Sequence, residues 1–112
     1  MDCIFCKIIN GDIPSTKVYE DEMVYAFKDI SPQAPIHVLV IPKKHIESTD
    51  EINETNSCYI SKVFEAIPKI ASSLNLKNGY RIITNTGDDA KQTVKHIHFH
   101  ILGGKAFEEK MV

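Results

Sequence analysis

The sequence predicts one compact domain in which helices and strands are combined. Its 112 residues fit a single domain, because a chain of this length buries about two-thirds of its unfolded surface. Apolar residues recur about every 3.6 positions over residues 57–74, which is typical of an amphipathic helix. Short apolar runs between turns, above all 37–41 and 96–102, are typical of strands. No repeat or linker divides the chain, so residues 1–112 are expected to form one domain.

The N-terminal part is predicted to contain a short helix and a β-hairpin. Ile4, Ile8 and Ile9 have helical spacing, and Gly11 can end the helix with a positive φ. Residues 18–20 and 23–27 favour strands and flank an acidic turn, a pattern that indicates a hairpin. A loop with two prolines then leads into the buried strand 37–41, which ends at the next proline.

The second half is predicted to begin with the long helix. Its apolar stripe consists of Ile60, Val63, Phe64, Ile67, Ile70, Ala71 and Leu74. Pro68 lies inside this pattern, so we expect a kink or an irregular turn there, and we expect Cys58 in the core. Asn78-Gly79 indicates a turn into a strand over residues 80–84, and residues 85–89 have the composition of a loop.

Composition and charge argue against several classes of protein. The 13 basic and 15 acidic residues give a net charge of −2, which does not provide the basic surface that a nucleic-acid polymer needs. No apolar run approaches the roughly 20 residues of a membrane span. The start Met1-Asp2-Cys3 is unlike a signal peptide, and three cysteines do not suit a disulfide framework. We therefore expect a cytoplasmic protein with neither a nucleic-acid polymer nor a membrane as its partner.

The most informative segment is His96-Ile97-His98-Phe99-His100-Ile101-Leu102. Alternate residues of a strand share one face, so three imidazoles would lie on one side and the apolar residues between them would enter a core. Three stacked structural histidines are rare, since each buried imidazole needs its own hydrogen-bond partner. The spacing leaves a metal site and a phosphate-processing site as interpretations. Same-face neighbours are about 6.6 Å apart, which favours a site spread along the strand.

This segment resembles the signature of the histidine-triad (HIT) family, in which three histidines alternate with apolar residues. The similarity extends over nearly the whole chain. The segments that resemble the histidine-triad nucleotide-binding branch of this family are residues 4–9, 11–14, 29–35, 37–46, 78–81 and 85. The resemblance implies an α+β, HIT-like fold: an antiparallel sheet of about five strands with one long helix and a short N-terminal helix. It also implies that the sheet continues across a homodimer.

The function implied by the resemblance is that of a purine nucleoside phosphoramidase, or nucleotidyl hydrolase, acting at the α-phosphate. The middle histidine is the nucleophile of the family, so His98 would attack phosphorus and form a nucleotidyl-imidazole that water hydrolyses. A neutral imidazole suits this role if its other nitrogen donates to an acceptor, for which we expect a backbone carbonyl. His100 would contact a phosphate oxygen as the second catalytic residue. Histidine rather than glutamine at this position favours hydrolysis over transfer to a second phosphate.

The same resemblance assigns further residues to a bound purine nucleoside monophosphate or its phosphoramidate. Asp29 would accept hydrogen bonds from the ribose hydroxyls, with Ile30 packed on the base or sugar. His37 matches a pocket histidine of the branch, although a core histidine would explain it almost as well. The complete set of predicted nucleotide-binding residues is Asp29, Ile30, His37, Asn85, Gln92, Thr93, His98 and His100.

Two segments depart from the family pattern. Lys91-Gln92-Thr93 stands where the family usually has Gly-Gln-Ser, so a permissive backbone position carries a lysine, which we expect to point to solvent. Residues 105–112 lack the Trp-Pro segment that some members have near the leaving group. A leaving-group preference therefore does not follow from the resemblance.

Cys3 and Cys6 are candidate metal ligands. From spacing alone the pair fits a redox couple, half of a zinc site or part of a short buried helix. Some relatives bind zinc through such a pair together with a histidine after the central strand and the first triad histidine, here His45 and His96. Two thiolates and two imidazoles have the composition of structural zinc. We expect zinc as a structural cofactor that the chemistry does not need, and the alternative is that both thiols are free.

Three other functions stay open at this point. A dinucleoside polyphosphate hydrolase would use the same triad on a different substrate. A nucleotide-regulated binding module would bind the nucleotide with little turnover. A pure metal-binding protein would use His98 as a ligand and would lose nucleotide binding together with its metal.

Overall fold

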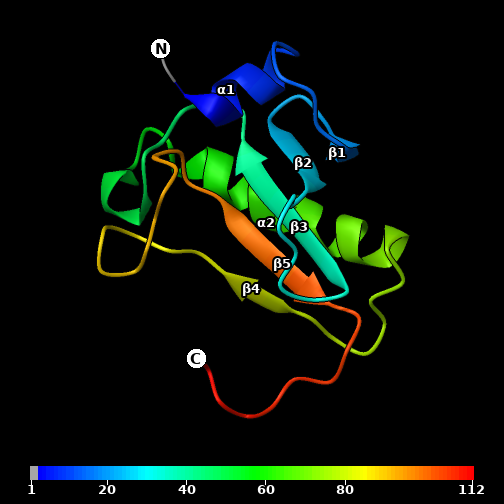
Figure 1. The fold of residues 1–112 in the computed structure, drawn as a ribbon. Helices are drawn as coiled ribbons and strands as arrows, with labels where there is room; N and C mark the ends of the chain where they lie inside the picture. The colour runs from blue at the N-terminus through cyan, green and yellow to red at the C-terminus, as the bar shows by residue number, and fades with distance from the viewer. Residues whose placement is uncertain (1–2) are drawn as a thin grey trace.

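The computed structural model describes residues 3–112, which are built on a five-stranded antiparallel sheet (Figure 1). The strands are β1 (Lys17–Glu20), β2 (Val24–Lys28), β3 (Ile36–Pro42), β4 (Arg81–Ile83) and β5 (Phe99–Gly103). Their order across the sheet is β1-β2-β3-β5-β4, and each neighbouring pair is antiparallel. The predicted sheet of about five antiparallel strands is confirmed.

A helix lies on each face of this sheet. The long helix α2 (Ser57–Ser73) buries its apolar stripe against Val38 and Val40 of β3. The short helix α1 (Ile4–Ile9) packs against Leu39 and Ile41, the alternate residues of the same strand. A single 3-10 turn, η1 (Thr49–Glu51), precedes α2. The α+β arrangement with one long helix and a short N-terminal helix is therefore confirmed for the residues described.

Both faces of β3 are covered, which explains why residues 37–41 form an uninterrupted apolar run rather than an alternating one. His37 is the one polar residue of that run, and it lies on the same face as α1. Neither helix of residues 3–112 has the length and hydrophobicity that crossing a membrane requires.

The last strand begins later than predicted. β5 starts at Phe99, so His96, which lies at a bend, and the next two residues, Ile97 and His98, precede the ladder. The Ile97 N–H donates to the Ile46 carbonyl at 2.6 Å, and the Thr84 hydroxyl donates to the His98 carbonyl at 2.9 Å. The backbone is therefore held here by separate contacts instead of strand pairing. The predicted alternation survives, because the apolar residues between the histidines are all buried in the core under α2.

Helix α2 differs from the prediction at three residues. Cys58 is exposed, so its assignment to the core is wrong; it lies in the first turn, away from the apolar stripe. Phe64, at the margin of that stripe, is 47% exposed and packs edge-on against Phe99 with centroids 5.2 Å apart. Pro68 does not interrupt the helix. Pro68 lies on the exposed side of the helix. Proline has no backbone N–H, so one helix carbonyl loses its partner, and water can hydrogen-bond to that carbonyl instead.

Candidate active site and metal centre

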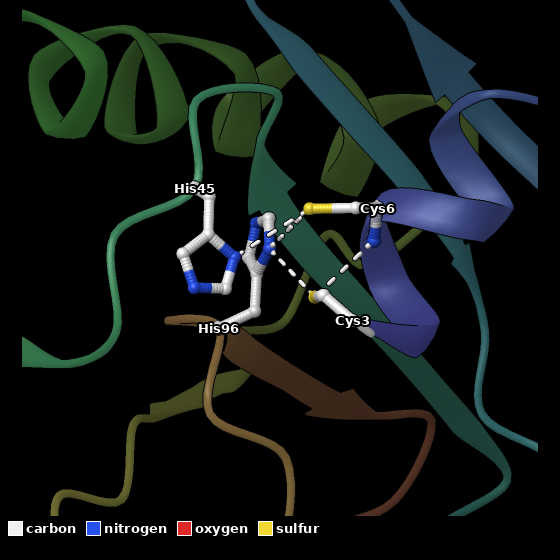
Figure 2. A group of neighbouring side chains, drawn as sticks. All are labelled: Cys3, Cys6, His45 and His96. Atoms are coloured by element: carbon white, nitrogen blue, oxygen red, sulfur yellow. Dashed lines mark hydrogen bonds between the residues drawn. The ribbon is translucent and has the colours of Figure 1, made fainter. Parts of the chain in front are cut away.

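Four side chains from three distant segments meet beside the start of α1 (Figure 2). Cys3 is the N-cap of α1, Cys6 lies in its first turn, His45 follows β3, and His96 precedes β5. Their ligand atoms all lie within 4.8 Å of one another. Cys3 Sγ is 3.4 Å from His96 Nδ1, and Cys6 Sγ is 3.5 Å from His45 Nδ1. The group predicted from the sequence is thus brought together and could hold a metal ion.

The surroundings of this cluster suit a metal ligand role. His96 Nε2 lies 2.8 Å from the Pro42 carbonyl and donates to it, so Nδ1 keeps its lone pair and faces the thiols. Burial lowers the pKa of His96 to about 4, which keeps the ring neutral at pH 7. Burial and a hydrogen bond with Cys3 raise the pKa of Cys6 to about 11, so a metal ion has to displace the thiol proton.

The orientation of His98 is set by the protein backbone. Its Nδ1 lies 2.7 Å from the His96 carbonyl oxygen, which can only accept, so Nδ1 carries the proton. The lone pair is then on Nε2. Burial lowers the pKa of His98, and the ring is neutral at pH 7. A backbone carbonyl thus accepts from His98 as expected, and the imidazole has the tautomer and charge that a nucleophile needs.

A second chain of hydrogen bonds orients His100. The Gln33 backbone N–H donates to His37 Nδ1 at 3.0 Å, so the proton of a neutral His37 ring is on Nε2. That nitrogen lies 2.8 Å from His100 Nδ1 and donates to it. The proton of His100 is therefore on its Nε2. Burial lowers the pKa of His100 to about 4, so at pH 7 this residue is a neutral hydrogen-bond donor.

Asp29 lies beside this chain of histidines. One carboxylate oxygen accepts from the Ser31 N–H at 2.7 Å, and the other is 3.5 Å from His37 Nε2. The ligand atoms of Asp29, His37 and His100 also lie within 4.8 Å of one another, as in a second possible metal group. However, His37 accepts at one ring nitrogen and carries its proton on the other, so it has no lone pair to offer. The chemistry here favours a polar ligand over a metal ion.

The other predicted nucleotide-binding residues differ in their accessibility. Ile30 is 99% exposed, and together with Asp29, Pro14 and Phe27 it lines a surface hollow. Thr93 is exposed, and Asn85 is half-buried beyond β4. Within residues 3–112, neither of their side chains hydrogen-bonds a histidine. The structure therefore brings together His37, His98, His100 and Asp29, with Ile30 next to Asp29. Thr93 lines a separate hollow with Cys3 and His45.

Gln92 is occupied within its own loop. Its amide nitrogen donates to the carbonyls of Glu47 at 2.7 Å and Val94 at 3.1 Å, and its Oε1 accepts from the Gly87 N–H at 3.1 Å. The residue is only 5% exposed. Both amide hydrogens of Gln92 are used within the protein, so in this structure its side chain supports the loop that carries Thr93.

Lys91 has a left-handed backbone conformation, with φ at +62°. Such a φ costs a residue with a Cβ atom about 1–2 kcal/mol, whereas glycine adopts it freely. Replacing Lys91 by glycine is therefore expected to raise the free energy of unfolding by about 1 kcal/mol in urea titrations. Lys91→Ala keeps the strained φ and removes the charge, so it should leave the stability within about 0.5 kcal/mol. Equal stability of Lys91→Gly and Lys91→Ala would contradict the strain.

Three features of the site have little or no signal in the sequence. The Gln33 N–H and the His96 carbonyl are backbone groups, which every residue has. Phe5 is a third: its ring packs edge-on against both His96 and His98. Its position inside Cys3-x-x-Cys6 is the only hint of that contact.

The fold and the site together define a histidine-triad type of protein, with alternating histidines at the start of β5 beside a carboxylate. The family model of the HIT domain matches residues 10–107. An uncharacterized HIT-like protein of Rickettsia prowazekii is 47% identical over 104 residues, which cover 91% of this chain and 87% of the relative. An uncharacterized HIT-like protein of Methanocaldococcus jannaschii is 48% identical over 100 residues, which cover 89% of this chain and 77% of the relative. The chain belongs to the HIT domain family.

Solved structures of similar sequence have the same fold. The HIT family hydrolase from Clostridium thermocellum superposes with a TM-score of 0.96 at 50% identity, covering 99% of this chain and 97% of that one. The histidine triad nucleotide-binding protein from Candida albicans superposes with a TM-score of 0.81 at 37% identity, covering 99% of this chain and 87% of that one. The resemblance inferred from residues 96–102 is thus confirmed.

Proposed function

We propose that this protein is a nucleotide hydrolase of the purine nucleoside phosphoramidase type, with His98 as its nucleophile. The observation that carries the proposal is the hydrogen bond from His98 Nδ1 to the His96 carbonyl, which leaves the Nε2 lone pair free. In the first step Nε2 bonds to the α-phosphorus, the bond from phosphorus to the leaving amine breaks, and the amine takes up a proton from solvent. Water then attacks phosphorus, the bond from phosphorus to Nε2 breaks, and the nucleoside monophosphate leaves. The attacking water gives one proton to solvent, and the imidazole is again neutral.

The same hydrogen bond favours the covalent intermediate. Nucleotidylation of Nε2 while Nδ1 keeps its proton makes the ring cationic, and the His96 carbonyl oxygen faces that charge. The His100 Nε2–H would donate to a phosphate oxygen, because His37 occupies the other nitrogen of that ring. His100 then stabilises the negative charge that develops on phosphate by donating as a neutral group.

The nucleoside would bind on the Asp29 side of the histidines. The Asp29 carboxylate accepts hydrogen bonds and suits the two hydroxyls of a ribose. Ile30, which is 99% exposed, would pack on the base or sugar at the hollow that it lines. Asn85 and Thr93 are proposed to contact the phosphate and the leaving group as neutral donors. The names of two similar proteins, a hydrolase and a nucleotide-binding protein, support the proposed class of function.

The experiment that tests the proposal is AMP release from adenosine 5′-phosphoramidate. The expected result is multiple turnover, with a denatured sample carrying one nucleotidyl group on the His98 peptide by mass spectrometry. Release of AMP from diadenosine polyphosphates alone would favour the dinucleoside polyphosphate hydrolase. Binding of AMP without turnover of either substrate would overturn the enzyme proposal in favour of a nucleotide-regulated binding module. The proposed location of this activity is the cytoplasm.

We also propose that Cys3, Cys6, His45 and His96 bind a structural zinc ion. The donor set, two sulfurs and two nitrogens from three segments, matches a closed tetrahedral site. All four ligands would be protein atoms, so no position on the metal would be left for a substrate. A bound zinc ion would therefore stabilise the fold around α1 and would not take part in the chemistry.

A homodimer in which two β4 strands pair is the proposed assembly. Of the two edge strands, β1 is blunted by a bulge and by the Lys17–Glu20 ion pair, whereas β4 exposes 39% of Ile82. A lysine at an edge strand opposes such pairing. Light scattering is expected to give twice the chain mass of 12.6 kDa for the wild type and 12.6 kDa for Ile82→Lys. A monomeric wild type would contradict the proposal.

A further inference from the structure

Phe5 joins the metal cluster to the proposed nucleophile. It lies between Cys3 and Cys6 in the first turn of α1, is 6% exposed and faces the sheet. Its ring centroid is 5.1 Å from that of His98 at an interplanar angle of 87°, and 5.9 Å from that of His96 at 69°. Both are edge-to-face contacts, a favourable arrangement for aromatic rings. One side chain therefore touches both a metal-ligand candidate and the proposed nucleophile.

Three contacts restrain His98 besides Phe5. It precedes β5, so no strand ladder holds its backbone, but the Thr84 hydroxyl donates to its carbonyl at 2.9 Å, and its ring lies 5.1 Å from that of His100 at a tilt of 58°. The hydrogen bond from Nδ1 to the His96 carbonyl selects the tautomer, but one hydrogen bond alone does not stop the ring from rotating. The edge-on contact with Phe5 restricts this rotation. The His96 carbonyl and the Phe5 ring both depend on the metal cluster, since His96 belongs to it and Phe5 lies between its two cysteines.

We propose that Phe5 is a positioning residue that holds the His98 imidazole in the orientation for attack, and that the metal cluster fixes the turn carrying Phe5. This inference rests on the proposed function of His98 as nucleophile. A misplaced nucleophile slows the chemical step without weakening the binding of the nucleotide. Phe5 also packs edge-on against Phe27, which lines the hollow proposed for the nucleoside, so losing the ring is expected to lower kcat more than the affinity for AMP.

Phe5→Leu in the zinc-loaded protein is the test, because leucine keeps an apolar side chain and both cysteines stay in place. We expect kcat on adenosine 5′-phosphoramidate to fall by about 10- to 100-fold, which is the loss that a misplacement of about 1 Å produces. The Kd of AMP should change by a smaller factor than kcat, and the zinc content should stay within about twofold of the wild type. Ile70→Val is the matched control: Ile70 is fully buried in α2 and packs on the opposite face of the sheet. It should lower stability and leave kcat unchanged.

A readout that does not depend on turnover is the ¹⁵N spectrum of the histidine rings, which reports the nitrogen that carries each proton. We expect a single Nδ1–H tautomer of His98 in the wild type and averaged or broadened signals in Phe5→Leu. An unchanged kcat with unchanged His98 signals would overturn the inference, as would a weaker Kd of AMP at constant kcat. If the wild type shows no turnover, the proposed function fails, and the ¹⁵N comparison still decides whether Phe5 orients His98. Phe5→Met serves the same comparison if Phe5→Leu does not fold.

Discussion

Replacing His98 by alanine is expected to reduce AMP release from adenosine 5′-phosphoramidate by at least about 10⁴-fold. The substitution removes the attacking nitrogen, and loss of a nucleophile in comparable covalent mechanisms costs about 10⁴- to 10⁶-fold. The remaining rate would come from nucleotide binding and from the hydrogen bond that His100 donates to the phosphate. His100 cannot replace His98 as the nucleophile, because its Nδ1 accepts from His37 and its Nε2 carries the proton. The measurement is the initial rate of wild type and variant at matched protein concentration and zinc content.

Two controls separate a lost nucleophile from a lost binding site. The Kd of AMP should change by less than about tenfold in His98→Ala, because the ribose contacts assigned to Asp29 do not involve His98. His100→Ala removes one donor to the phosphate, for which a loss of about 10²- to 10³-fold in kcat is typical. His100→Ala should still form the nucleotidyl group on the His98 peptide. A His98→Ala protein with the wild-type rate would rule out covalent catalysis by this residue.

Periodicity predicted the elements of the fold because burial follows it closely. The stripe over residues 57–74 became α2, and the alternation over residues 96–102 put the apolar residues between the histidines into the core. The metal group also followed from the sequence, through the resemblance and the number and type of its ligands. In each case the information lies in side chains, which a sequence states directly.

The remaining features depend on backbone positions that a sequence does not specify. The start of β5 at Phe99 follows from where Ile97 finds a carbonyl partner, which lies on the segment after β3. The tautomers of His98 and His37 follow from one carbonyl and one N–H. Lys91 keeps a glycine-like φ although its side chain disfavours it. Local chemistry therefore identified the histidines, and tertiary contacts decided what each ring can do.

Cys6→Ser is expected to lower the melting temperature of the zinc-loaded protein by about 15 °C. A ligand present at about 1,000 times its Kd stabilises the folded state by about 4 kcal/mol. For a domain of this size, each kcal/mol shifts the melting temperature by about 4 °C. A serine hydroxyl does not replace a thiolate as a zinc ligand, so most of this stabilisation should be lost. The measurement is thermal unfolding followed by circular dichroism, with zinc content determined on the same samples.

Cys58→Ser is the matched control for this prediction, because Cys58 is exposed on α2 and lies outside the metal group. It should bind one zinc ion per chain and melt within about 2 °C of the wild type. A chelator should bring the wild type down to the melting temperature of Cys6→Ser and leave Cys6→Ser unchanged. Equal melting temperatures of the wild type with and without zinc would contradict a structural metal. His96 belongs both to this cluster and to the hydrogen bond that orients His98, so the two largest predicted effects meet in one residue.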